Sequence, residues 1–78
     1  MNTQDYIIVD PKICHGKPCF KNTRVMVHTV LELLAGGIKP EEITEDKYYP
    51  QLTDDHIRAA LHYAAAVSEA GELVEFAA

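Results

Sequence analysis

Hydrophobic residues recur at helical spacing in the middle of the chain. Four of them fall on one face of a helix: Val27, Val30, Leu31 and Leu34. Gly36 and Gly37 follow, and a glycine pair supplies the left-handed conformation at which helices commonly end. The pattern therefore predicts a helix of about two to three turns between Val27 and the glycine pair.

A second helical pattern occupies the C-terminal third. Thr53 is a good N-cap residue, and Asp54 and Asp55 follow it, where carboxylates complement the helix dipole. We expect one buried apolar stripe on this helix: Ile57, Ala60, Leu61, Ala64 and Val67. Gly71 ends the pattern.

A shorter helix is predicted between these two. Pro40 begins it, because proline is favoured in the first helical turn, and Glu41-Glu42 lie beside its positive end. We expect it to end near Tyr48-Tyr49, because Pro50 disfavours the helical conformation in the residue before it.

The first 26 residues lack helical periodicity. Tyr6–Val9, closed by Asp10-Pro11, is typical of a short edge strand, and Pro18–Phe20 is a second extended piece. Gly16 and Asn22 tolerate the left-handed conformation that tight turns require. We therefore expect two extended pieces connected by turns.

Together these elements predict a mainly α fold, in which a short N-terminal β element precedes three helices of the kind that frame helix-turn-helix domains. We divide the chain into an N-terminal β/turn arm (residues 1–26), a trihelical core (27–70) and an apolar, acidic tail (71–78). With 78 residues, 47% of them hydrophobic, one domain has little buried area to spare, so we expect a homodimer.

The tail is too short to form a core of its own. Two interpretations stay open: it folds back on the domain or frays, or it becomes ordered on a partner. The second interpretation makes three apolar residues candidates for partner binding: Leu73, Val74 and Phe76.

The chain has the features of a cytoplasmic protein. Residues 1–10 hold two carboxylates and no basic side chain, unlike a signal peptide. The apolar stretches are shorter than the ~20 residues that a bilayer requires, so we expect no membrane contact. Cys14 and Cys19 are then reduced thiols rather than a disulfide.

Charge is divided unevenly along the chain. Residues 1–26 carry four Lys or Arg against two Asp, which gives +2, and residues 27–78 carry three against ten carboxylates, which gives −7. These values add to the formal net charge of −5. One part of the protein can therefore face an anionic partner and the other a cationic one.

Metal or thiol chemistry would involve Cys14, His15 and Cys19. Their spacing does not match a zinc knuckle, and a structural zinc site needs a fourth ligand. A reactive cysteine needs a base and an orienting carboxylate, and neither lies at a credible spacing. We expect no enzyme, cofactor or metal, and a zinc or redox site is the weakest alternative.

Nucleic-acid binding is the stronger possibility. Four cations of the N-terminal arm are candidates for phosphate contacts: Lys12, Lys17, Lys21 and Arg24. Arg58 and His62 on the last helix are candidates for contacts with base edges. Asp54 and Asp55 stand where a recognition helix meets DNA. The N-terminal cations would therefore make most of the DNA contacts, and a dimer would double the number of these cations.

Three stretches of the chain together resemble the bacterial family known as domain of unknown function 433: DPKICHGKPCFKNTRVMV, LELLAGGIKPEEI and YPQLTDDHIRAALHYAA. The resemblance covers about residues 7 to 66, and its motifs are specific as a set rather than singly. Two positions depart from the family pattern, since Asn22 stands where glycine is usual and Met26 where proline is usual.

The resemblance implies a homeodomain-like helix-turn-helix fold and a role like that of VapB-type antitoxins, which are encoded beside PIN-like toxin proteins. Such a protein would neutralise a PIN-like ribonuclease toxin and repress its own operon by binding operator DNA. The alternative is a stand-alone dimeric DNA-binding transcriptional regulator that has no toxin.

Overall fold

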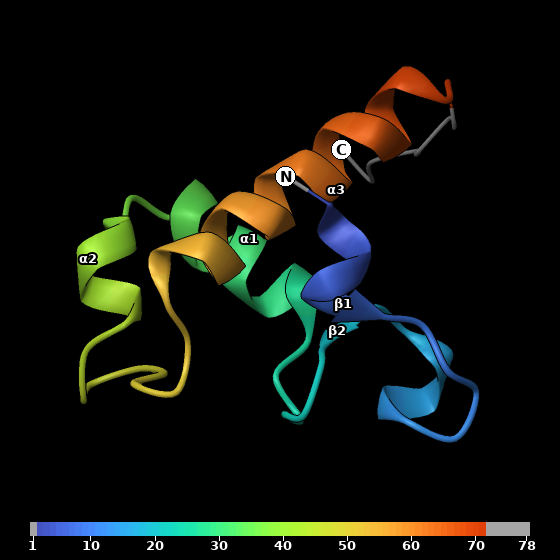
Figure 1. Ribbon diagram of the computed structural model, residues 1–78. Helices are drawn as coiled ribbons and strands as arrows, with labels where there is room; N and C mark the ends of the chain where they lie inside the picture. Colours follow the sequence, from blue (N-terminus) through green and yellow to red (C-terminus); the bar gives the residue numbers. More distant parts are fainter. Residues whose placement is uncertain (1, 72–78) are drawn as a thin grey trace, which may run out of the picture.

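The computed structural model describes residues 2–71, and in this part of the chain a two-stranded antiparallel sheet precedes three α-helices. The elements, drawn in Figure 1, are β1 (Ile7–Ile8), β2 (Cys19–Phe20), α1 (Val27–Ala35), α2 (Pro40–Ile43) and α3 (Asp54–Glu69). Short 3₁₀ turns lie before β1, at Thr3–Asp5, and between the strands, at Cys14–Gly16. This arrangement confirms the mainly α prediction for these residues.

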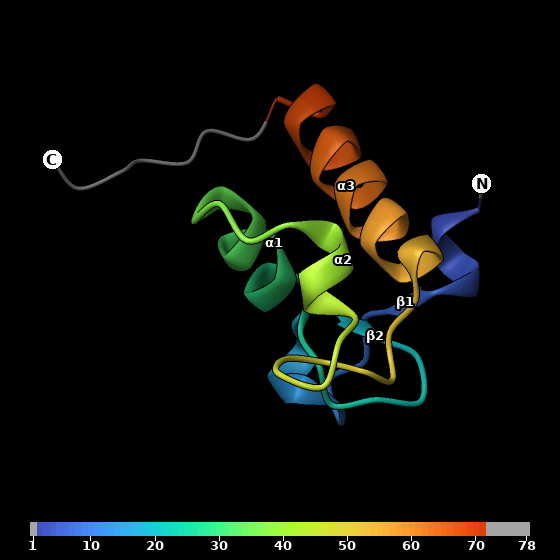
Figure 2. The same cartoon turned by 90° about the vertical axis from the view of Figure 1, so that its left-hand side faces the viewer.

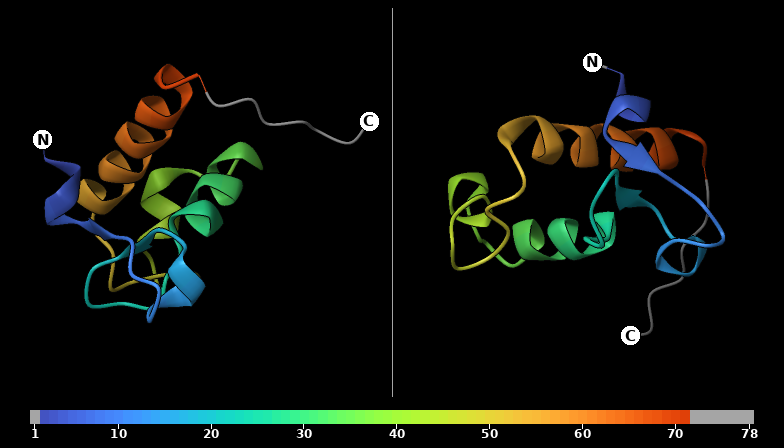
Figure 3. Two further views of the ribbon diagram at one scale, coloured as in Figure 1. Left: turned by 90° about the vertical axis from the view of Figure 1, so that its right-hand side faces the viewer. Right: turned by 60° about the horizontal axis from the view of Figure 1, so that its bottom comes forward.

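The two strands and α2 lie at opposite ends of α1 (Figures 1 and 3). Ile7 pairs with Phe20 and Ile8 with Cys19, and a further bridge joins Cys19 to Met26. β2 is therefore held on both sides, by β1 and by the residue that precedes α1. The predicted extended pieces are confirmed at this place.

One apolar core connects the sheet with the helices. The largest fully buried side chains come from β2, α1 and α2: Phe20, Ile43, Val27, Val30 and Cys19. α3 adds Ile57, Ala59 and Ala60, and Leu52 closes the core from the segment before α3. Figure 2 shows α1, α2 and the N-terminal half of α3 gathered around this centre. Within residues 2–71, no helix combines the length and hydrophobicity that crossing a membrane requires.

α1 ends at the predicted glycine pair. Gly37 has a φ of 92°, the N–H of Ile38 donates to the carbonyl of Leu33 at 3.0 Å, and the N–H of Gly37 donates to Leu34 at 3.0 Å. This bonding is a Schellman motif, which satisfies carbonyls that the helix leaves unpaired. Thr53 is the N-cap of α3, so that prediction is also confirmed.

The prediction for α2 is wrong at its C-terminal end, because the helix stops at Ile43 rather than near Tyr48-Tyr49. The N–H of Tyr49 donates to the carbonyl of Ile43 at 2.9 Å, and that of Leu52 donates to the carbonyl of Tyr49 at 3.0 Å. The chain thus turns back directly after Ile43. Ile43 and Leu52, on either side of this reversal, are both buried in the core.

The prediction for the buried face of α3 is wrong at Leu61, whose surface is 49% exposed, whereas Ala59 is fully buried. The turn at Thr3–Asp5 packs on α3, and Tyr6 packs against the core beside it. The buried face of the helix is therefore rotated toward the N-terminal arm. Periodicity within one helix cannot reveal a covering segment from so far away in the sequence.

Candidate interaction surfaces

The segment between β2 and α1 forms a tight turn. Thr23 closes it, since its Oγ1 donates to the carbonyl of Phe20 at 2.8 Å and accepts from the N–H of Val25 at 3.1 Å. Asn22 has a φ of 62°, a conformation that asparagine tolerates better than most residues. The lysine before Asn22 and the arginine after Thr23 are consequently held, exposed, on a fixed turn.

The two thiols beside this turn are buried and free rather than poised to react. Cys14 is 9% and Cys19 0% exposed. Burial, followed by the neighbouring Cys14, raises the pKa of the Cys19 thiol, and a protonated thiol is a poor nucleophile. Among residues 2–71, no group of three or more His, Cys, Asp or Glu side chains is arranged to hold a metal ion.

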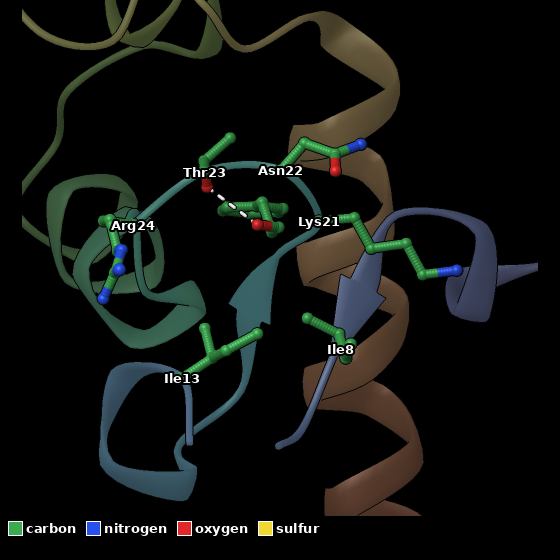
Figure 4. A pocket seen from close by; sticks show the side chains of 7 residues that line it. Ile8, Ile13, Lys21, Asn22, Thr23 and Arg24 are labelled. Atoms are coloured by element: carbon green, nitrogen blue, oxygen red, sulfur yellow. Dashed lines mark hydrogen bonds between the residues drawn. The ribbon is translucent and has the colours of Figure 1, made fainter. Parts of the chain in front are cut away.

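A pocket of about 610 Å³ opens next to the turn, between the strands and the segment before α1. In Figure 4, Ile8 and Ile13 face each other across it, and Lys21 and Arg24 extend from opposite ends. Phe20 also lines it, together with the residues of the turn. The pocket therefore combines an apolar floor with a cationic rim.

A second pocket of about 270 Å³ shares Arg24 with the first and adds Lys12 and His15 to its lining. No carboxylate is found among the described residues that line these two pockets. We call the region around Lys12, Lys21 and Arg24 the cationic surface. It contains three of the four residues that were predicted from the sequence to contact phosphates.

The remaining predicted nucleic-acid-binding residues lie elsewhere. Lys17 is exposed between the strands but lines neither pocket. Arg58 and His62 are exposed on α3, and the Nη1 of Arg58 lies 3.5 Å from Oδ1 of Asp55. The structure thus separates the cationic surface from Arg58 and His62 on α3, and Lys17 lines neither of its two pockets. The predicted partner-binding residues lie outside the described residues: Leu73, Val74 and Phe76.

A third pocket, of about 280 Å³, lies between α2 and the N-terminal half of α3. Six residues line this acidic groove: Pro40, Glu41, Asp54, Ile57, Arg58 and Leu61. Hydrophobic periodicity does not reveal this groove, because it places Leu61 in the core. The signal that could have found it is the position of Leu61, which directly precedes a histidine and lies three residues beyond an arginine, at the polar edge of the stripe.

His56 forms an unusual cap at the start of α3, which was not predicted from the sequence. The N–H of Thr53 donates to its Nδ1 at 3.0 Å, and the Thr53 hydroxyl lies 2.9 Å from the same nitrogen. The rings of Tyr6 and Phe20 meet the imidazole edge-on, with centroids 5.2 Å and 5.5 Å away. Burial lowers the pKa of His56, although the charge of Asp55 opposes this shift. The neutral imidazole, with Nδ1 as acceptor, therefore joins α3 to the N-terminal arm.

These features define a class of protein: a small, mainly α domain with a two-stranded N-terminal sheet, a cationic surface beside the strands and an acidic groove beside α2. The family described as "Protein of unknown function (DUF433)" matches residues 7–64. The chain belongs to this family, which confirms the predicted resemblance at that level.

The fold is similar to the crystal structure of a DUF433 member protein from Anabaena variabilis ATCC 29413. The TM-score is 0.75 and the sequence identity 32%, over 85% of this chain and 63% of the other. The chain therefore spans less than two thirds of the length of that relative. No protein with a curated description matches the chain significantly.

Proposed function

We propose that this protein is the antitoxin component of a toxin-antitoxin pair. In this proposal it acts in the cytoplasm as a homodimer, neutralises a PIN-like ribonuclease and represses its own operon. The observation that carries the proposal is the separation of charge between the cationic surface beside the strands and the acidic groove beside α2. Such a separation suits two partners of opposite charge. We propose no catalytic step, cofactor or metal for this chain.

The acidic groove supports the nuclease half of the proposal. A ribonuclease holds its anionic substrate with cationic side chains, so an acidic inhibitor complements the same surface and is steered toward it. Inhibition then requires only that the antitoxin cover the path of the RNA. The Mg²⁺ of a PIN-like nuclease would be held by carboxylates of the nuclease itself.

Operator binding is assigned to the cationic surface rather than to α3. In a homeodomain-like arrangement, α2 and α3 would form the helix-turn-helix pair, with the start of α3 in the major groove. Here the start of α3 carries Asp54 and Asp55, both exposed, and residues 44–53 connect the helices, which is longer than the usual turn of three to four residues. Phosphate contacts from Lys12, Lys21 and Arg24 of two subunits are the better electrostatic match.

Co-expression with the product of the neighbouring reading frame tests the proposal. We expect that product alone to arrest growth, and this protein to restore growth and copurify with it. A catalytically inactive version of the neighbour serves as the control for expression load. If growth is not restored and the two proteins do not copurify, the antitoxin proposal is wrong.

The alternative is a stand-alone dimeric regulator, which the carboxylate-free lining of the two cationic pockets favours. A gel shift with the isolated protein and DNA from its own promoter, at about 150 mM salt, distinguishes the two. A specific shift without any partner protein, together with normal growth when the neighbour is expressed alone, would favour the regulator.

A further inference from the structure

The acidic groove combines an apolar floor with carboxylates from two helices. Ile57 lies at the bottom and is 3% exposed, whereas Leu61, one turn further along α3, is 49% exposed. Glu41 comes from α2 and Asp54 from the first turn of α3, so the groove has an acidic side chain on each wall. A single exposed leucine is ordinary on a protein surface, but one that lines such a groove offers an anchoring point for another apolar side chain.

The charge around the groove indicates which kind of partner can bind there. Residues 39–61 contain three Lys or Arg and six carboxylates, which leaves −3. The arginine in the groove, Arg58, lies beside Asp55 and is therefore partly neutralised. Nucleic acid is disfavoured here, and so is a second copy of the chain, because a twofold axis through the groove would place like charges opposite each other.

We propose that the acidic groove docks a basic amphipathic segment, in which one apolar side chain packs on Ile57 and Leu61 and flanking Lys or Arg side chains pair with Glu41 and Asp54. The assignment of this segment to the nuclease rests on the proposed function. The docking chemistry itself does not depend on that assignment. Leu61 and Asp54 of α3 therefore serve a protein partner, not DNA.

The first experiment needs no natural partner. The probe is an alanine-based helical peptide of about 14 residues, long enough to form a helix, with one leucine flanked by lysines one turn before and after it. Its two matched controls replace the leucine by serine or the lysines by glutamates. We expect the basic leucine peptide to shift the NMR methyl signals of Ile57 and Leu61, and each control peptide to bind at least about tenfold more weakly.

Variants of the protein complete this test. Leu61→Ala and the charge reversal Glu41→Lys should each weaken peptide binding about tenfold. Val9→Ala is the matched control, because Val9 is a similarly exposed aliphatic residue, 57% exposed, that does not line the groove. Leu61 is half exposed, so Leu61→Ala should leave thermal unfolding nearly unchanged.

The second experiment measures the copurifying nuclease with the same variants. If the nuclease binds the wild type and binds Leu61→Ala and Glu41→Lys equally well, the groove is not its docking site and the inference fails, while the antitoxin proposal stands. If the nuclease does not bind the wild type, the antitoxin proposal fails, and the peptide experiment still decides the docking chemistry. Peptide shifts that fall outside the groove, or a loss of self-association in Leu61→Ala by light scattering, would overturn the inference.

Discussion

At the scale of single residues, His56 carries a stability effect that depends on pH. Its Nδ1 accepts from the N–H of Thr53, which only the neutral imidazole can do in this orientation, and burial lowers its pKa below the ordinary 6.5. As the pH falls, the unfolded chain therefore binds the proton first. The stabilisation from His56 is complete above pH 6.5 and is lost as the pH falls through the lowered folded-state pKa.

This effect is measured by urea unfolding at about pH 7.5 and about pH 5. His56→Gln is the matched variant, since glutamine at the same position completes a capping box but does not titrate. We expect the wild type to lose about 1 kcal/mol more than the variant between the two pH values, which is the usual value of a cap. Parallel losses would show that His56 does not couple protonation to folding.

Ile57 and Leu61 provide a second comparison at this scale. Ile57 is 3% exposed and lies in the core, so Ile57→Ala should cost about 2 to 5 kcal/mol of the free energy of unfolding. Leu61→Ala should cost less than about 1 kcal/mol, because half of that side chain already meets water. Urea titrations of both variants check the difference. Equal costs would show that Leu61 is packed as tightly as a core residue, and would rule it out as an anchoring point in the acidic groove.

At the scale of elements, the end of α1 depends on one glycine of the pair. Gly37 has a φ of 92°, a conformation that costs a side-chain-bearing residue about 1 to 2 kcal/mol, whereas Gly36 has an ordinary φ of −79°. Gly37→Ala should therefore lower the free energy of unfolding by about 1 kcal/mol. Gly36→Ala is the control and should be close to neutral, since its added Cβ would meet the Glu32 carbonyl at 3.4 Å. Thermal melts of both variants test this, and similar losses would contradict it.

The elements also show which parts of the fold the sequence could predict. The C-terminal end of α1 and the start of α3 were predictable because Gly37 and Thr53 act through bonds to residues close in sequence. The end of α2 was not, because Pro50 shows only that a helix must stop before it. Ile43 and Leu52 decide the actual end by entering the same core from two sides.

The candidate surfaces also differ in whether residues close in sequence or distant residues form them. Lys21 and Arg24 could be assigned to one cationic surface from the sequence, because a short turn holds them together. The acidic groove and the contact between Tyr6 and His56 could not, since each joins residues distant in the sequence. The Thr3–Asp5 turn packs on α3 from far away in the sequence, and the buried face of the helix includes Ala59 while Leu61 is exposed.

At the scale of the whole molecule, the cationic surface and the acidic groove can be tested by separate variants. The fold uses the main chain of Arg24, whose carbonyl lies 3.8 Å from the Cys14 Sγ as hydrogen-bond acceptor, while its side chain is exposed. Arg24→Ala should therefore leave the thermal melting temperature nearly unchanged. An unfolded variant would show that the Arg24 side chain is structural and would remove it from the cationic surface.

The salt dependence of operator binding then decides which surface holds DNA. Each phosphate contact contributes about 0.9 to the slope of log K against log salt, so Arg24→Ala in a homodimer should reduce the slope by about 1.8, and in a monomer by about 0.9. Arg58→Ala is the control, because Arg58 lines the acidic groove, lies beside Asp55 and should not change the slope. Fluorescence anisotropy of labelled promoter DNA across a salt series measures both. An equal loss in Arg58→Ala would place α3 on the DNA and reverse the assignment of the two surfaces.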